Sequence, residues 1–311
     1  MVSRNNVLFA GVKNTDQSMD KEIKMAEDKL IEINNLRLKY DTSSPKKNLF
    51  FSKNINPDAI FKGQEDAYVL DDVSLDINKG EFHIFLGASG CGKSTLLNII
   101  AGFLQKTDGS VMIDGREITQ PGRERGVVFQ NAELAIYPWL TVYKNVEFGL
   151  KLQKVKKAER KKTVDKALEL VGLSEHRNKY PSELSGGMKQ RVQIARSIAS
   201  DPEILIMDEP FGALDAQTRR TLQDELIRIW QQTKKTILFV THDLQEAVYL
   251  GQKISIFSAA PNAHIAKQIE VNLPYPRRAG DAKVAMITAD VATELNKAIN
   301  AHGEESVDKS A

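Results

Sequence analysis

The order of apolar and polar residues divides the chain into segments of different period. Residues 30–40 (LIEINNLRLKY) alternate apolar and polar side chains, and residues 69–77 (VLDDVSLDI) repeat the alternation. A period of two is typical of a β-strand with one buried face. We therefore predict a half-buried strand in each of these segments.

Continuous apolar runs indicate a second kind of strand. A short run at 82–86 leads into a group of glycines, and the runs 204–207 (ILIM) and 236–240 (TILFV) are apolar on both faces. Parallel strands covered by helices on both faces have this composition. Helical spacing follows Ser94 and returns between the two later runs, at Leu222, Leu226, Ile229 and Trp230. The pattern predicts an α/β fold.

The remaining segments carry weaker patterns. Residues 1–29 are polar and charged and predict a mobile leader, and residues 41–66, rich in Asn, Ser, Lys and Pro, predict a long surface loop. The segment 142–171 is predicted to be largely helical. Residues 276–311 are interpreted as a tail with a short helix around 291–299.

Composition narrows the function classes. The chain has 311 residues and a net charge of +2, so no overall field favours nucleic acid or anionic lipid, and we expect no nucleic-acid partner. Cys91 is the single cysteine, which excludes an intrachain disulfide, leaves no set of zinc thiolates and favours a reducing, cytoplasmic compartment. No apolar stretch is long enough to suggest a spanning helix. If the protein serves a membrane, another chain must span it.

The segment GASGCGKS, residues 87–94, satisfies the pattern GxxxxGK[ST] between a predicted strand and a predicted helix. Glycines allow the backbone N–H groups to wrap a phosphate, Lys93 reaches the β- and γ-phosphates, and the Ser94 hydroxyl takes a Mg²⁺ coordination position. We therefore expect ATP and Mg²⁺ to bind here. The expected phosphate-binding residues are Gly87, Ala88, Ser89, Gly90, Cys91, Gly92, Lys93, Ser94 and Thr95.

Acidic residues follow the apolar run 204–207, where a phosphate-binding loop needs a partner for its metal. Asp208 is the candidate metal ligand, and Glu209 is the candidate base that orients and deprotonates the attacking water. His242 follows the next buried strand. A lone histidine there is ordinarily structural, but its place beside a nucleotide site makes it a candidate γ-phosphate contact and catalytic residue.

Six motifs in one order carry a resemblance to a known family. They are GASGCGKST, Gln130 after VVF, LSGGMKQR at 184–191, ILIMDEP, FGALD at 211–215 and THD at 241–243. Over residues 30–275 the chain resembles the nucleotide-binding subunit of an ATP-binding cassette (ABC) transporter. The resemblance implies a P-loop NTPase core of the ABC ATPase type, with an antiparallel β subdomain and an inserted helical subdomain at about 131–183.

The resemblance also implies how the sites are shared. In this family the signature LSGG, here Ser185, Gly186 and Gly187, serves the nucleotide held by the other subunit of a head-to-tail dimer. Gln130 then contacts the metal and nucleotide, and Asp215 communicates across the interface. The segments PWLTVYKNVEFGL, FGALDAQTR and LPYPRR are similar to importer ATPases of the nitrate, sulfonate and taurine group. These work at the cytoplasmic face of the inner membrane, with a separate permease and a solute-binding protein.

Several assignments stay open from the sequence. The aromatic residue that stacks on adenine is Tyr40 by its position at the end of the first strand, with Tyr68 and Phe61 as competitors. Pro138, Trp139 and Leu140 with the apolar residues after them form either a seat for a permease helix or the core of the helical segment. The lysine-rich run 151–162 is either a solvated helix face or a lipid-attracting one. A soluble ABC ATPase acting on ribosomes or nucleic acid is the alternative function.

Overall fold

A computed structural model of the chain describes residues 29–39, 67–278 and 280–305, and two sheets organise the described residues. Residues 1–28 of the expected leader, the 41–66 loop and Tyr40 therefore lie outside the described residues, whereas Lys29 is the first residue of a strand. The larger sheet has the strand order β10-β9-β3-β8-β7-β6. Its strands are β3 (Phe82–Leu86), β6 (Arg125–Val128), β7 (Ile204–Asp208), β8 (Thr236–Thr241), β9 (Lys253–Phe257) and β10 (Ile265–Glu270).

Strands β9, β3, β8, β7 and β6 run parallel, and only the edge strand β10 is antiparallel to its neighbour. Every residue of β3 is buried, and β7 is buried up to its last residue. The continuous apolar runs of the sequence therefore form the centre of this sheet, as predicted. Alternate side chains face opposite layers: Phe82 and Ile84 pack in one hydrophobic core, whereas Phe85 packs in the other.

The smaller sheet covers one face of the parallel sheet together with α3 (Lys93–Ala101). Its order is β2-β1-β4-β5, formed by β1 (Lys29–Leu38), β2 (Leu70–Asn78), β4 (Asp108–Ile113) and β5 (Arg116–Glu117). All of its pairings are antiparallel. The alternating segments at the start of the chain thus become two neighbouring strands of an antiparallel layer, β2 at its edge and β1 inside it. Ile31, Ile33 and Leu36 of β1 point into the shared core.

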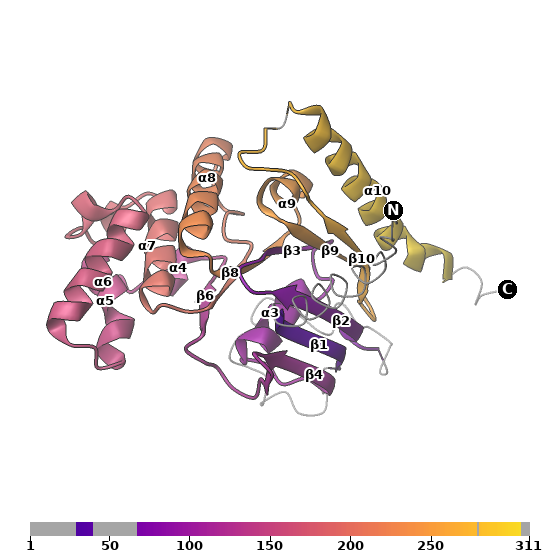
Figure 1. The fold of residues 1–311 in the computed structure, drawn as a ribbon, viewed down its shortest axis with the longest axis horizontal. Helices are drawn as coiled ribbons and strands as arrows, with labels where there is room; N and C mark the ends of the chain where they lie inside the picture. The colour runs from indigo at the N-terminus through magenta and orange to yellow at the C-terminus, as the bar shows by residue number, and fades with distance from the viewer. Residues whose placement is uncertain (1–28, 40–66, 279, 306–311) are drawn as a thin grey trace, which may run out of the picture.

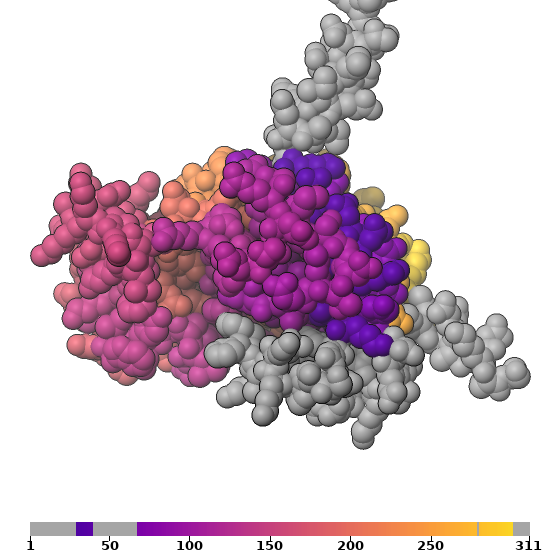
Figure 2. Space-filling view, turned by 90° about the horizontal axis from the view of Figure 1, so that it is seen from below, coloured from indigo at the N-terminus to yellow at the C-terminus, as the bar shows by residue number. Residues whose placement is uncertain are grey.

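Helices cover the other face and extend beyond the sheet. They are α4 (Ala132–Ala135), α5 (Val142–Leu152), α6 (Lys157–Leu170), α7 (Gly186–Ala199), α8 (Ala216–Thr233) and α9 (Leu244–Leu250), with the short 3-10 turns η1 (Ser174–His176) and η2 (Pro181–Glu183). Figure 1 shows α5, α6 and α7 gathered at one end of the molecule, away from the antiparallel strands. From below, the same helices form a lobe beside the β layer (Figure 2).

The C-terminal helix differs from the sequence expectation. A short helix was expected around 291–299, but α10 spans Ala282–Glu305. Val284, Val291 and Ala298 are buried in the same core as the central strands, and α10 lies along the end of the molecule opposite the helical lobe (Figure 1). Their spacing of seven residues corresponds to two helical turns, so one stripe of the helix packs from Val284 to Ala298. The small residues and scattered polar residues of 282–290 hid this stripe from the sequence.

These arrangements confirm the predicted fold class, a P-loop NTPase core with an antiparallel layer and a helical lobe. The order of the parallel strands has a consequence for function. Strands β3, β8, β7 and β6 are neighbours, so the loops after them meet at one edge of the sheet. Ligands of open parallel sheets bind outside the carboxyl ends of the strands. The loops that follow β3, β6, β7 and β8 carry the candidate residues.

Candidate functional site

The glycine-rich loop after β3 has the backbone that phosphate binding requires. Gly90 and Gly92 have φ of +82° and +96°, a left-handed region that side chains rarely adopt. A Cβ on Gly92 would also lie 2.8 Å from Leu70 Cδ2. The loop leads directly into α3, whose first N–H groups have no helical partners. Backbone donors and the positive end of the helix therefore converge on the same point.

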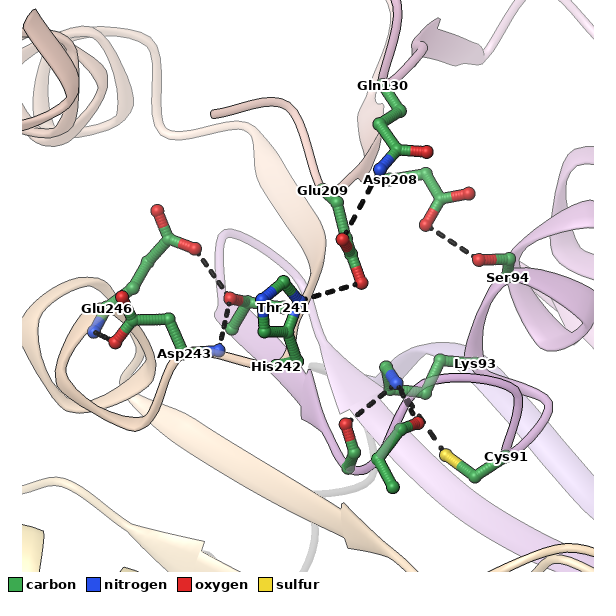
Figure 3. A network of polar contacts seen from close by, with 12 residues as sticks. Cys91, Lys93, Ser94, Gln130, Asp208, Glu209, Thr241, His242, Asp243 and Glu246 are labelled. Carbon is green, nitrogen blue, oxygen red and sulfur yellow. Dashed lines mark hydrogen bonds and ion pairs between the residues drawn. The ribbon is translucent and has the colours of Figure 1, made fainter. Parts of the chain in front are cut away.

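Lys93 lies inside this loop and is buried. Its Nζ donates to the carbonyl oxygens of Gly87 at 2.9 Å and Ala88 at 2.7 Å. The ammonium group is thus held inside the loop by neutral carbonyl oxygens. The arrangement therefore provides a cation at the position where a phosphate is expected (Figure 3).

Two further observations test whether the loop fits a nucleotide. The buried Thr95 Oγ1 has no hydrogen-bond partner among the described residues, and a buried hydroxyl without a partner is costly. A phosphate oxygen at the start of α3 would satisfy it. Cys91 is buried, and burial raises the pKa of its thiol, so this side chain is a small apolar spacer under the loop. The loop thus fits the phosphates of ATP.

The metal candidates are in contact with each other. Ser94 Oγ donates to Asp208 Oδ1 at 2.8 Å across the gap between α3 and the end of β7. Burial raises the pKa of the Asp208 carboxyl, and a cation beside it would stabilise the charged form. A hydroxyl and a carboxylate are the oxygen donors that Mg²⁺ prefers. The residues present therefore fit this metal.

Glu209, which follows β7, has a strained backbone. Its φ is +41°, which is uncommon for any residue with a side chain, and the next residue is Pro210, which disfavours helical conformations of its predecessor. The Glu209 N–H donates to Val240 O at 3.1 Å, and its carbonyl accepts from Gly212 N–H. Such strain costs about 1–3 kcal/mol and tends to occur at functional sites. Here it directs the carboxylate toward the loop after β8.

The Glu209 carboxylate joins residues from two other strands. His242 Nδ1 lies 3.1 Å from its Oε1, and Gln130 Nε2 donates to its Oε2 at 3.4 Å. These residues follow β8 and β6, so the structure brings together three candidates that are far apart in the sequence (Figure 3). His242 is 55% exposed and Glu209 19%, so the pair faces solvent and is accessible to a water molecule and a phosphate. The geometry suits a base that activates water.

The signature residues form a different hollow. Ser185 caps α7 by accepting a hydrogen bond from Met188 N–H, and a Cβ on Gly187 would lie 2.6 Å from Thr218 of α8. Ser185 and Gly186 are exposed. The hollow in front of Ser185 and Gly187 has about 320 Å³. The residues that line it are Gly172, Leu173, His176, Ser185, Gly187, Met188, Arg191, Thr218 and Thr221. None of the 87–95 loop is among them.

Of the three aromatic residues that could stack on adenine, the structure describes one. Tyr40 and Phe61 lie outside the described residues. Tyr68 is half-buried, and the guanidinium of Arg37 lies 5.9 Å from the centre of its ring. Tyr68 precedes Leu70, which packs against Gly92 of the phosphate loop. Of the three aromatic residues considered, Tyr68 therefore lies near the loop in the described structure.

The apolar residues between Pro138 and Leu152 form a buried set and an exposed set. Val142, Val146 and Leu150 pack in the main core, so they belong to the helical lobe itself. Trp139 is 70% exposed and Leu152 69% exposed. Beside them lies a groove of about 320 Å³ whose lining includes Tyr137, Phe148, Leu152, Arg125 and Arg196. The segment thus provides both a core and an exposed apolar surface.

Sequence reasoning missed Glu246, a buried carboxylate behind His242. Glu246 Oε2 accepts from Thr241 Oγ1 at 2.6 Å, and its Oε1 accepts from Gln223 Nε2 at 3.0 Å. A charged residue among the apolar residues of LQEAVYL was the available signal. Its partner Gln223 lies on another helix, and no local pattern predicts that contact.

Comparisons with known proteins agree with this geometry. Residues 70–212 match the family model described as ABC transporter. The chain is 48% identical over 238 residues to the taurine import ATP-binding protein of Rhizobium johnstonii, covering 76% of this chain and 88% of that protein. It is 49% identical over 216 residues to the nitrate import ATP-binding protein of a Synechocystis strain, covering 69% and 80%.

A solved structure shares the fold as well. A dimeric ATP-binding cassette in a post-hydrolysis state, bound to ADP and phosphate, superposes with a TM-score of 0.62 at 28% identity, covering 79% of this chain and all of that one. Among the described residues, no helix is both long and apolar enough to cross a membrane.

Proposed function

Because the chain belongs to the family of ABC transporter ATP-binding proteins, we propose that its ATP hydrolysis drives import of a small solute such as nitrate, a sulfonate or taurine. The protein is an ATPase that associates with a membrane permease and works as a dimer of ATPase subunits. The observation that supports turnover is the Glu209 carboxylate, held by His242 and Gln130 beside the phosphate loop. The taurine and nitrate importers among the relatives support the choice of solute.

In the proposed reaction, Lys93 and the N–H groups of the loop bind the β- and γ-phosphates. Ser94 and Asp208 hold Mg²⁺, which when bound supplies positive charge to the phosphate oxygens. Glu209 orients the attacking water and accepts its proton, and His242 donates a hydrogen bond to the γ-phosphate. Gln130 links this site to the helical lobe, because it follows β6 and precedes α4.

The signature residues Ser185, Gly186 and Gly187 complete the site of the partner subunit. Support comes from the hollow at Ser185, which contains no residue of the phosphate loop, and from the N-terminus of α7, which suits an anion. Asp215, which caps α8 through Gln217 and Thr218 N–H, then lies in the turn that communicates between the subunits. Tyr68, or Tyr40 by the family pattern, stacks on adenine.

Chain mixing tests this sharing of sites. We expect Lys93→Ala and Ser185→Arg chains to be inactive alone, because each lacks one half of every site. An equimolar mixture should recover about a quarter of the wild-type phosphate release, since half of the dimers then carry one intact site. No recovery in a mixture that forms dimers would contradict the shared site.

The permease binds at the exposed apolar surface around Trp139 and the neighbouring groove. A solute-binding protein delivers the solute to the permease, and the subunit works at the cytoplasmic face of the inner membrane. In the native host, deletion of the gene for this chain should abolish uptake of labelled taurine or of nitrate. The wild-type chain should restore the uptake and Glu209→Gln should not. Unchanged uptake of both solutes in the deletion strain would contradict the proposed import.

A further inference from the structure

A buried bridge lies directly behind His242. The Thr241 hydroxyl, at the end of β8, donates to Glu246 on α9, and the Gln223 amide, on α8, donates to the other oxygen of the same carboxylate. Thr241 is 2% exposed, Gln223 6% and Glu246 7%. Burial raises the pKa of the Glu246 carboxyl, and the hydroxyl and the amide are its two direct hydrogen-bond donors. Three structural elements thus meet at one carboxylate.

The bridge fixes the peptide that carries His242. Thr241 Oγ1 gives its only proton to Glu246, so its lone pairs are free to accept, and Asp243 N–H donates to it at 2.9 Å. Asp243 in turn caps α9 by accepting from the N–H groups of Gln245 and Glu246. Both neighbours of His242 are therefore held by hydrogen bonds, whereas its imidazole projects toward Glu209 (Figure 3).

We propose that Thr241 and Glu246 are positioning residues that set the place of the His242 imidazole relative to Glu209 and the γ-phosphate. The proposal rests on the role given above to His242. Thr241 and Glu246 are buried behind His242, so the proposed role is exerted through the histidine. The buried hydrogen bond between the Thr241 hydroxyl and the Glu246 carboxylate fixes the position of these two residues. Loss of this bond would allow the turn that carries His242 to relax. A misplacement of about 1 Å costs on the order of a hundredfold in rate.

The bridge also connects His242 to the turn that the proposed function places between subunits. Gln223 lies on α8, and α8 begins at its cap Asp215. A second contact runs alongside, because Arg219 donates to Leu214 O at 3.0 Å and lies 3.6 Å from Asp243. A shift of the 211–215 turn would therefore move α8, and with it the Gln223 and Arg219 contacts that hold the turn carrying His242.

The strand itself supplies a matched control. Thr236 begins β8 and Thr241 ends it. Thr236 is also buried, at 1% exposure, and its hydroxyl accepts from Gly80 N–H at 2.8 Å. Thr236→Val and Thr241→Val remove the same hydroxyl from the same strand, but at opposite ends. Thr241→Ser keeps the hydroxyl and loses only the methyl group.

The experiment measures kcat and KM for Mg²⁺–ATP on the full chain, together with thermal unfolding. We expect Thr241→Val to lower kcat by on the order of 10- to 100-fold with KM within about twofold, whereas Thr236→Val keeps the wild-type kcat at a similar loss of Tm. Thr241→Ser should restore most of kcat. Equal kcat values for the two valine variants, or a change in KM alone, would overturn the proposal.

Glu246→Gln provides a second variant of unchanged volume. Its amide can still accept from Gln223, but it presents an N–H to the Thr241 hydroxyl, so the hydroxyl loses its acceptor. We expect a lower kcat at unchanged KM, and a double variant with Thr241→Val no slower than the slower single variant. Additive losses would overturn the single bridge. A wild-type chain without ATP hydrolysis would instead contradict the proposed function.

Discussion

Two glutamate–histidine pairs lie at the ends of strands of the central sheet, and they differ in burial and in surroundings. At the start of β3, His83 Nδ1 lies 2.5 Å from Glu81 Oε1, with the histidine fully buried. After the end of β8, His242 Nδ1 lies 3.1 Å from Glu209 Oε1, with the histidine 55% exposed. The same two side chains form a structural contact in one place and a candidate reaction centre in the other.

The direction of the strands explains the difference. Because β3 and β8 are parallel neighbours, the starts of the parallel strands lie along one edge of the sheet and their ends along the opposite edge. The start of β3 and the end of β8 are therefore far apart. The edge at the strand starts is closed: Ser255 Oγ lies 2.9 Å from His83 Nε2, and Glu81 contacts the other ring nitrogen, so both nitrogens have partners. The edge at the strand ends is open and adjoins the phosphate loop, where substrates of parallel sheets bind. Position in the sheet, and not the residue pair, assigns the role.

Replacement of each glutamate by glutamine is the test of this comparison with the largest expected effect. Glu209→Gln should lower kcat by about 10²- to 10⁴-fold, because an amide cannot accept the proton of the attacking water. The ATP-bound dimer should persist, since the binding residues are unchanged. Phosphate release and size-exclusion chromatography with Mg²⁺–ATP measure the two effects.

Glu81→Gln is the matched control for that test. It should lower the free energy of unfolding by about 1 kcal/mol, because the buried His83 loses a charge-assisted hydrogen bond. Its kcat should equal that of the wild type. If Glu81→Gln reduced kcat as strongly as Glu209→Gln, the separation of the two edges into structural and catalytic would be wrong.

The sequence predicted the residues at the open edge better than those at the closed edge, for a physical reason. Lys93, Asp208 and Glu209 follow apolar strands in short motifs, and phosphate chemistry restricts which residues can stand there. The parallel strands were predicted because runs that are apolar on both faces have few other structures. The left-handed backbone of Glu209 could not be predicted, since it depends on Val240 O of the adjacent strand.

Contacts between segments that are far apart in the sequence also could not be predicted. His83 reads as an ordinary polar residue in FHIFL, and only pairing of β3 with β9 brings Ser255 beside it. Likewise, Glu246 meets Gln223 through the packing of α9 and α8. Val284 at the start of α10 packs in a core that the local pattern does not reveal. Local period identifies an element, but the partner of a buried polar group is decided by tertiary packing.

The smallest expected effect is a pH dependence of stability that arises from the buried His83. Burial lowers the pKa of His83 below its ordinary value of 6.5. As the pH falls below about 6.5, the unfolded chain takes up a proton that the folded chain does not. The free energy of unfolding should therefore be fully maintained above pH 6.5 and should decline as the pH falls toward the folded pKa, with a slope of at most about 1.4 kcal/mol per pH unit.

Urea unfolding at pH 7.5, 6.5 and 5.5 measures this slope for the wild type and for His83→Gln. The variant lacks the buried imidazole, so its stability should fall less between pH 6.5 and 5.5 than that of the wild type. Parallel profiles for the two chains would show that the buried pair does not respond to pH.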